Sequence, residues 1–294
     1  MSDLTTPDFL SIGVVTYDVT PEPGLPHGRV RSGGAAAFGA LCAQALGLKA
    51  AVVTSAAPDY PVGSILPGIP LHVVGSKFTT FFQNVYDLNG ERTQVLGGRS
   101  SSITRSDIPP AWLDAPIVFF GPLVHETPPD ANRWFPDAVV GAAIQGWLRR
   151  WDDYGRVTED TDFPAGVSDG YRLLAGSTTE FPVDNEAEMS RWAACTEVLG
   201  VTDGSNGVRI YVQANGGSPG APSRVPGYAA NELDPTGAGD IWAAACLVRL
   251  AETGNSLEAA RFANAAASVS VEREGLSGSP DRAEIAARLA RGPA

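Results

Sequence analysis

The sequence is poor in lysine and has no long hydrophobic run. Lys49 and Lys77 are its only lysines, and 33 Asp and Glu residues outnumber 21 Lys and Arg residues, which gives a formal net charge of −12 at pH 7. An acidic surface repels the phosphates of nucleic acids and of anionic membranes, so we expect neither as a partner. No run of about 18 apolar residues is present, so we expect no membrane-spanning helix.

Cysteine is equally scarce, which bears on the cellular compartment. Cys42, Cys195 and Cys246 are widely spaced, form no Cys-x-x-Cys pair and lie beside apolar neighbours. We expect buried free thiols in a reducing environment. Residues 1–7 lack the basic start of a secretory signal. These features predict a cytoplasmic protein.

Two widespread site motifs are also absent. There is no Gly-x-x-x-x-Gly-Lys-Ser/Thr sequence, which excludes a P-loop, and no pair of histidines at helical spacing that would bind a metal. With 294 residues, of which 44% are apolar and 18% charged, the chain has the composition of a globular protein with a sizeable core.

Alternating apolar segments indicate a sheet flanked by helices. The order strand, helix, strand at residues 9–15, 35–46 and 50–54, with Gly47 as the helix C-cap, favours a parallel sheet. Further elements are strands at 117–120, 139–144, 172–175, 198–202 and 208–212, a loop at 213–226, and helices from Gly237 to about Glu252 with Gly254 beyond its end, from Ser256 as N-cap to Gly275, and from about Asp281 to Arg291. We predict a three-layer α/β/α sandwich with a mostly parallel central sheet, in a single domain over residues 1–294.

An aromatic segment interrupts this alternation. Residues 78–86 are rich in β-forming side chains, Asn89-Gly90 is a hairpin turn signal, and residues 91–96 supply a return strand. Together with residues 28–32 this segment predicts a small β-sheet that covers the main domain as a lid, formed by about 19–32 and 77–97.

The most informative segment is Asp234-Pro235-Thr236-Gly237-Ala238-Gly239-Asp240, which an apolar helix follows directly. A glycine-rich turn that opens a helix leaves backbone N–H groups pointing at one spot, where the helix dipole adds positive character. Such an anion hole suits a phosphoryl group in transfer. We expect the positive surroundings to keep Asp240 ionised as a general base for a hydroxyl. A plain Asp N-cap is the alternative, but it does not explain the two glycines, the Thr and the second Asp upstream.

This segment resembles the DTxGAGD signature of the ribokinase-like (PfkB) carbohydrate kinase family, and the resemblance extends along most of the chain. It implies that Gly237, Ala238, Gly239 and Asp240 are catalytic. It further implies that Asp18, at the end of the first strand, and the double glycine Gly33-Gly34 bind substrate. Nucleotide would be bound by Thr236, by the turn of Thr202, Gly204 and Gly207, and by Asn264, although backbone groups are equally plausible partners for a buried Asn.

Departures from the family pattern narrow the expected substrate. Where many relatives have Asn-x-x-Glu, this sequence has Ser177-Thr178-Thr179-Glu180. The resemblance implies that Glu180, with Ser177, binds magnesium through waters; an acid in a first helical turn is the alternative. Phe38 stands where ribokinases proper have the Asn of the sugar pocket, which argues against a ribofuranose.

These substitutions are similar to those of the plant-type myo-inositol kinase branch. Gln145-Gly146-Trp147-Leu148-Arg149 resembles a loop of that branch and implies substrate contacts from Gln145 and Arg149, the latter steadying a phosphate. Ala143 replaces the usual Asp of this loop, and a surface Arg beside Arg150 is the alternative.

The expected activity is therefore ATP- and Mg²⁺-dependent phosphorylation of a hydroxyl on a small polyol or sugar, with a cyclitol such as myo-inositol favoured. A nucleoside or other sugar kinase, and a ligand-binding relative without catalysis, are the alternatives. The resemblance also leaves open a monovalent cation beside the anion-hole loop and a homodimer through the lid strands.

Overall fold

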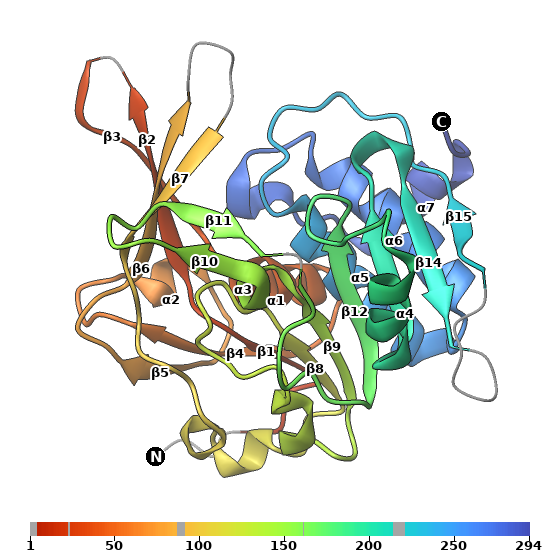
Figure 1. Cartoon of the computed structure of the whole chain (residues 1–294), viewed down its shortest axis with the longest axis horizontal. Coiled ribbons are helices and arrows are strands. Elements are labelled where there is room, and N and C mark those ends of the chain that lie inside the picture. The colour runs from red at the N-terminus through yellow and green to blue at the C-terminus, as the bar shows by residue number, and fades with distance from the viewer. Residues whose placement is uncertain (1–4, 23, 87–91, 161, 214–220) are drawn as a thin grey trace.

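A nine-stranded sheet forms the centre of the molecule, and its inner strands are apolar segments without polar alternation (Figure 1). The computed structural model describes residues 5–294 apart from 23, 87–91, 161 and 214–220. In spatial order the strands are β15 (Ser223–Val225), β14 (Val208–Val212), β13 (Thr196–Thr202), β12 (Tyr171–Ser177), β9 (Val139–Ala143), β8 (Ile117–Phe120), β1 (Phe9–Ile12), β4 (Ala50–Ala56) and β5 (Leu71–Gly75).

Most of this sheet is parallel. All neighbours from β13 to β5 pair in parallel, whereas β14 and β15 continue the β13 edge in antiparallel pairing. The predicted sandwich with a mostly parallel sheet is confirmed. The loop predicted at 213–226 is wrong at Ser223–Val225, because these residues pair with β14.

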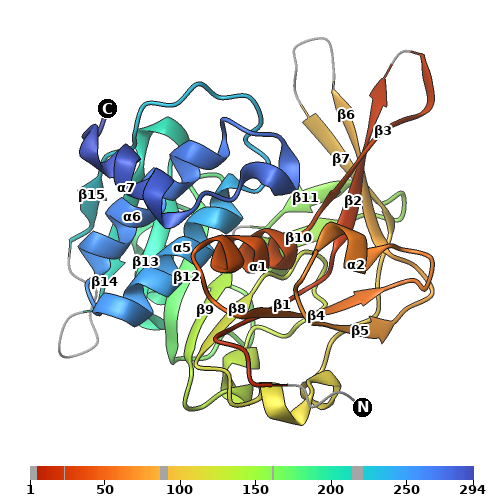
Figure 2. The ribbon, with the colours of Figure 1, turned by 180° about the vertical axis from the view of Figure 1, so that it is seen from behind.

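Helices cover both faces of the sheet. One face carries α1 (Ala35–Ala45), α5 (Ala238–Thr253) and α6 (Ser256–Ser270), with α7 (Arg282–Ala290) packed on α6 (Figure 2). The opposite face carries α4 (Glu186–Ala194). The remaining short helical segments are α2 (Val62–Ile65), α3 (Gln145–Leu148), and the 3-10 turns at Arg105–Asp107, Pro110–Trp112, Ala131–Trp134, Gly204–Asn206 and Gly275–Gly278.

Two helix boundaries differ from the prediction. Asn255, not Ser256, caps α6, because its side chain accepts the Glu258 amide at 3.1 Å. The same helix ends at Ser270, ahead of Gly275. The predicted glycines at the ends of α1 and α5 are confirmed, and both are left-handed, with φ of 88° at Gly47 and 66° at Gly254.

A second sheet of four strands projects from the body (Figure 1). Its spatial order is β3 (Leu25–Gly33), β2 (Thr16–Glu22), β6 (Thr80–Tyr86) and β7 (Arg92–Gly98). The predicted aromatic hairpin corresponds to β6 and β7, and its Asn89-Gly90 turn lies outside the described residues. The hairpin of β10 (Arg149–Trp151) and β11 (Val157–Glu159) adjoins this sheet through a bridge between Val95 and Arg156.

The chain leaves the central sheet earlier than predicted. β1 ends at Ile12, and Gly13 has a φ of 157° and lies so close to Gly121 that a Cβ would be 2.3 Å from the Gly121 carbonyl oxygen. Beyond it, the buried Glu126 carboxylate accepts the Val14 amide at 3.0 Å. The following residues therefore enter the second sheet instead of extending the first strand.

The three cysteines are buried and free, as predicted. Among the described residues, no helix combines the length and the apolar character needed to cross a membrane.

Candidate active site

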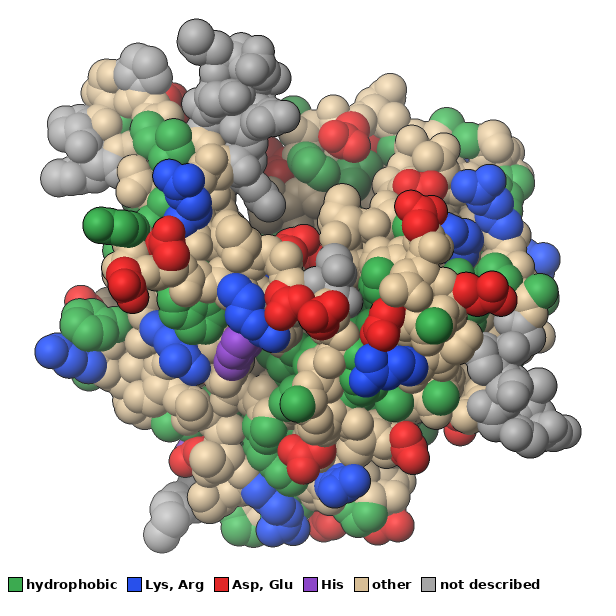
Figure 3. Space-filling view, in the orientation of Figure 1, with side chains coloured by type: hydrophobic (Ala, Val, Ile, Leu, Met, Phe, Trp, Pro, Cys, Tyr) green, Lys and Arg blue, Asp and Glu red, His purple; other side chains and the backbone are tan. Residues whose placement is uncertain are grey.

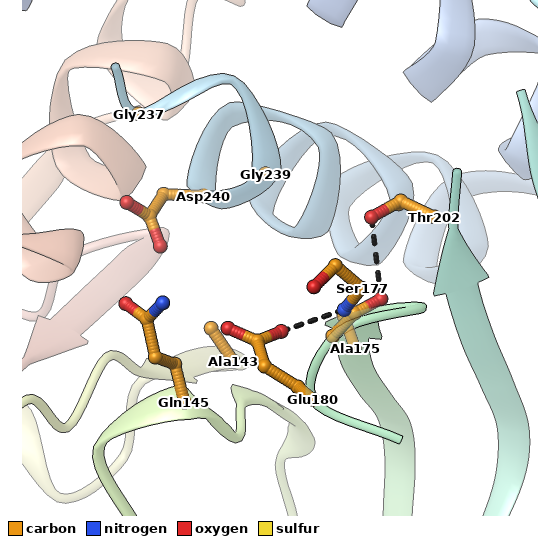
Figure 4. A pocket seen from close by; sticks show the side chains of 10 residues that line it. Ala143, Gln145, Ala175, Ser177, Glu180, Thr202, Gly237, Gly239 and Asp240 are labelled. Carbon is orange, nitrogen blue, oxygen red and sulfur yellow. Dashed lines mark hydrogen bonds between the residues drawn. The ribbon is translucent and has the colours of Figure 1, made fainter. Parts of the chain in front are cut away.

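The carboxyl ends of three parallel strands meet the start of α5 at a pocket of about 260 Å³ (Figure 4). Figure 3 shows the surface hollowed between the projecting second sheet and the body. The pocket is lined by Ala143 of β9, by Ala175, Gly176 and Ser177 of β12, by Thr202 of β13, and by Gln145, Glu180, Gly237, Gly239 and Asp240.

The turn before α5 has the geometry that the sequence predicted for an anion hole. Gly237 has a left-handed φ of 79°, and α5 begins at the next residue. A Cβ on Gly237 would lie 2.4 Å from the Phe38 ring, so only glycine fits. Within the residues that the structure describes, the amides of Gly239 and Asp240 have no backbone acceptor. Both residues line the pocket, which leaves these donors available to an anion.

The Ala238 amide does not belong to this set. It donates to the Pro235 carbonyl at 3.2 Å, and Ala238 lines the neighbouring cavity. The Ala238 amide therefore closes the turn and does not contribute to the predicted anion hole. Thr236, predicted to bind nucleotide, lines neither cavity. Its amide donates to Asp234 Oδ1 at 3.0 Å and supports the loop from within.

Asp240 and Gln145 point toward one another across the pocket (Figure 4). Desolvation, followed by the negative charge of Glu180, raises the pKa of Asp240 to about 7, against the lowering effect of Arg149. Without ligands, these surroundings therefore favour the protonated form of Asp240 more than the sequence predicted. Asp240 keeps partial exposure through the pocket, so screening by water limits the shift.

Glu180 is held at the carboxyl end of β12. One carboxylate oxygen accepts the Ser177 amide at 2.6 Å and the other is turned toward the pocket (Figure 4). No helix begins at Glu180, since α4 starts at Glu186, so the alternative of a first-turn acid is wrong. The carboxylates of Glu180 and Asp240 and the Ser177 hydroxyl suit a hydrated magnesium ion, which takes oxygen ligands and keeps several waters. Among the described residues, no group of three or more acidic, His or Cys side chains forms a closed metal site.

Arg149 lies beneath the pocket and not on the surface. Its side chain is almost buried, covers the Phe82 ring at 4.8 Å, and donates to Gln145 Oε1 at 2.9 Å. The surface alternative is thus wrong. Arg149 orients Gln145 and carries positive charge toward Asp240.

A second cavity of about 450 Å³ adjoins the first and shares Thr202 and Gly239 with it. The predicted Gly204 and Gly207 form one wall, and Gly207, with φ 90°, approaches the Val225 carbonyl so closely that a Cβ would be 2.2 Å from its oxygen. The opposite wall consists mainly of apolar side chains that sequence reasoning did not identify: Tyr228, Pro235, Trp242, Ala267 and Val271. Of these, only Trp242 could have been predicted from the sequence, because it lies about one helical turn beyond Gly239 on α5.

Asn264 lines this cavity, but its amide group serves the protein. Oδ1 accepts Trp242 Nε1 at 2.7 Å, while Nδ2 donates to the carbonyls of Val225 and Pro226 at 3.1 and 2.9 Å. The backbone alternative is therefore the one observed, and Asn264 shapes the cavity wall.

The predicted substrate residues of the first strand lie elsewhere. Asp18 lies on β2 in the second sheet, close to Gly33, and neither Asp18 nor Gly33-Gly34 lines either cavity. Gly34 caps α1 with φ 110°, where a Cβ would be 2.5 Å from the Val14 carbonyl oxygen. The early departure of the chain at Gly13 is the reason for this placement.

Comparison with solved structures first identifies the fold. A pyrophosphate-dependent kinase in the ribokinase family, solved with a pyrophosphate analogue and myo-inositol, superposes with a TM-score of 0.74 at 22% identity, over 95% of this chain and 99% of that one. Ribokinase from Arabidopsis thaliana, solved with ribose and ATP, superposes with a TM-score of 0.73 at 21% identity, over 97% and 99% of the two chains. The fold is therefore ribokinase-like.

Part of the sequence also resembles a known family. Residues 172–282 match the pfkB family of carbohydrate kinases. Ribokinase from Arabidopsis thaliana is 33% identical over 175 residues, which is 55% of this chain and 44% of the relative, and probable fructokinase-5 of the same plant is 41% identical over 86 residues, 27% and 25% of the two chains. The chain thus aligns with less than half the length of these relatives.

Proposed function

We propose that this protein is a kinase that transfers a phosphoryl group from ATP to a hydroxyl of a small polyol or sugar. The observation that carries the proposal is the pocket in which the Asp240 carboxylate stands beside the open amides of Gly239 and Asp240. An acceptor hydroxyl placed there would give its proton to Asp240, and the amides would stabilise the charge on the phosphoryl group.

The second cavity supports a nucleotide donor. A base and ribose need an extended, largely apolar space next to the phosphate site, and this cavity meets the first at Thr202 and Gly239. Pyrophosphate has no base or ribose and would leave the second cavity empty, so we favour ATP as the donor. Pyrophosphate is the alternative donor to be tested. Magnesium held through water by Glu180 and Ser177 would neutralise charge on the donor phosphates.

A cyclitol such as myo-inositol is the acceptor we favour, and ribose or fructose is the second candidate. Phe38 is 2% exposed and packs under Gly237, so it offers no polar group to a ribofuranose. The solved myo-inositol complex supports a cyclitol for that related kinase, while the sequence relatives are a ribokinase and a fructokinase.

An acceptor screen tests the proposal. Inositols, ribose, ketoses, sugar acids and nucleosides are each incubated with Mg²⁺ and either ATP or pyrophosphate, and acceptor-dependent release of ADP or phosphate is measured. Asp240→Asn, which has the same shape, is the matched control for contaminating kinases. Tight binding of an acceptor without turnover from either donor would replace the proposal with a ligand-binding protein.

A homodimer through the second sheet also remains a proposal. Leu25, Val30 and Val85 expose 47%, 56% and 41% of their surface there. Light scattering that shows a monomer at micromolar concentration would contradict it.

A further inference from the structure

An ion pair joins the second sheet to the loop that precedes α5. Arg31 on β3 donates from Nη1 to Asp234 Oδ2 at 2.8 Å, and its Nη2 lies 3.6 Å from Glu274 Oε2. The Asp234 side chain is only 5% exposed, whereas that of Arg31 is 37% exposed. The contact therefore brings a guanidinium from a projecting sheet to a nearly buried carboxylate 203 positions away in the chain.

The Asp234 carboxylate organises the start of the anion-hole loop. Its Oδ1 accepts the Thr236 amide at 3.0 Å, and its Oδ2 accepts the Gly275 amide at 3.0 Å beside Arg31. Burial raises the pKa of Asp234, but the hydrogen bonds from Thr236 and Gly275 and the charge of Arg31 lower it by more, so the group is ionised at neutral pH. Asp234 and Thr236 lead directly into Gly237, so their position sets the start of α5.

Arg31 also stands next to the residue predicted to bind substrate. In the antiparallel pairing of β2 with β3, Arg31 is directly opposite Asp18, so both side chains are on one face of the second sheet. Two residues later the same strand reaches Gly33, where a Cβ would be 3.3 Å from Asp18 Oδ2. One strand thus runs beside Asp18 and contacts the loop that carries the anion hole.

We propose that Arg31 is a positioning residue for phosphoryl transfer, which holds Asp234 from the second sheet and so aligns the anion hole and Asp240 with an acceptor bound against that sheet. The proposal rests on the proposed kinase function. Removing the guanidinium leaves a nearly buried carboxylate without the cation it contacts, which destabilises the observed loop geometry. Because Arg31 lines neither cavity, the donor KM should change little.

The kinetic test compares Arg31→Ala with Arg29→Ala. Arg29 lies two residues away on the same strand and pairs with Glu22 at 2.6 Å in solvent. The Arg29→Ala variant therefore removes the same charge and leaves the contact of Arg31 with Asp234 in place. We expect Arg31→Ala to lower kcat about tenfold or more, equivalent to ~1.4 kcal/mol, with donor KM nearly unchanged. Arg31→Lys should recover part of the loss, and added guanidinium ion should raise the kcat of Arg31→Ala but not that of Arg29→Ala.

A second measurement needs no turnover. Hydrogen exchange followed by mass spectrometry should show faster exchange of the amides at 236–241 in Arg31→Ala and no change in Arg29→Ala. If the wild-type protein phosphorylates no acceptor, the kinase proposal fails, and the exchange data still decide whether Arg31 holds the loop. Unchanged exchange, an equal kcat loss in Arg29→Ala, or faster exchange with unchanged kcat would each overturn the role assigned to Arg31.

Discussion

The raised pKa of Asp240 predicts a steep acid limb in the pH dependence of catalysis. A base with a pKa of about 7 is about 1% ionised at pH 5, so kcat/KM should fall about 100-fold between its plateau and pH 5, with a limiting slope of one decade per pH unit. An aspartate with the ordinary pKa of about 3.9 would remain more than about nine-tenths ionised at pH 5 and would give a flat profile.

The assay measures initial rates from pH 5 to 9 at constant ionic strength, with acceptor and donor both well below their KM, so that the profile reports the protein without ligands. The donor phosphates also titrate near pH 6, so a variant must separate the two sources of a limb. Because the charge of Glu180 raises the pKa of Asp240, Glu180→Gln should move the limb to lower pH even if its absolute rate is reduced. His125→Gln should keep the limb.

A profile that stays flat down to pH 5 would refute the assignment of Asp240 as a base with a raised pKa. A limb that does not move in Glu180→Gln would assign it to the donor and refute the electrostatic reasoning as well.

Three further variants follow from the same structure. Asp240→Asn should lower kcat by roughly 10²–10⁴-fold, with nucleotide binding retained in calorimetry. Because the pKa of Asp240 is raised in the folded state, its ionisation lowers stability as pH rises from the ordinary pKa toward about 7. Asp240→Asn should therefore raise Tm more at pH 8 than at pH 5. Gly237→Ala should cost about 1–2 kcal/mol from its φ of 79° alone, plus the clash with Phe38, whereas Gly239→Ala, where a Cβ meets nothing within 4 Å, should keep its unfolding midpoint; equal midpoints would contradict this. Asn264→Ala should cost about 1–3 kcal/mol in denaturant unfolding and weaken nucleotide binding, because Trp242 Nε1 loses its acceptor; unchanged donor affinity would show that the Val225–Pro226 wall does not depend on this amide.

The sequence predicted those parts of the site that depend on local geometry. Gly237 and Asp240 are three residues apart at the start of a helix, and the glycine turn together with the following apolar run is sufficient to indicate an anion hole. The turn with Gly204 and Gly207 could be predicted for the same reason. The order of apolar segments likewise predicted the parallel sheet, because each buried strand carries its own signal.

The features that the sequence did not predict depend on contacts between segments that are distant in the chain. No local pattern shows that Gly13 must pass against Gly121, which is why Asp18 was expected at the end of the first strand and lies on β2 instead. The pairing of Arg31 with Asp234 and the pKa of Asp240 depend on folding in the same way. Ser223–Val225 is a strand only because β14 offers it an edge.

Among the described residues, Thr202 and Gly239 line both cavities. The walls on either side of that boundary come from different segments, with Tyr228, Trp242 and Val271 on one side and Gln145 and Glu180 on the other. A substitution in one set of walls therefore leaves the residues of the other set unchanged, so the proposed donor cavity could diverge while the proposed catalytic pocket is kept.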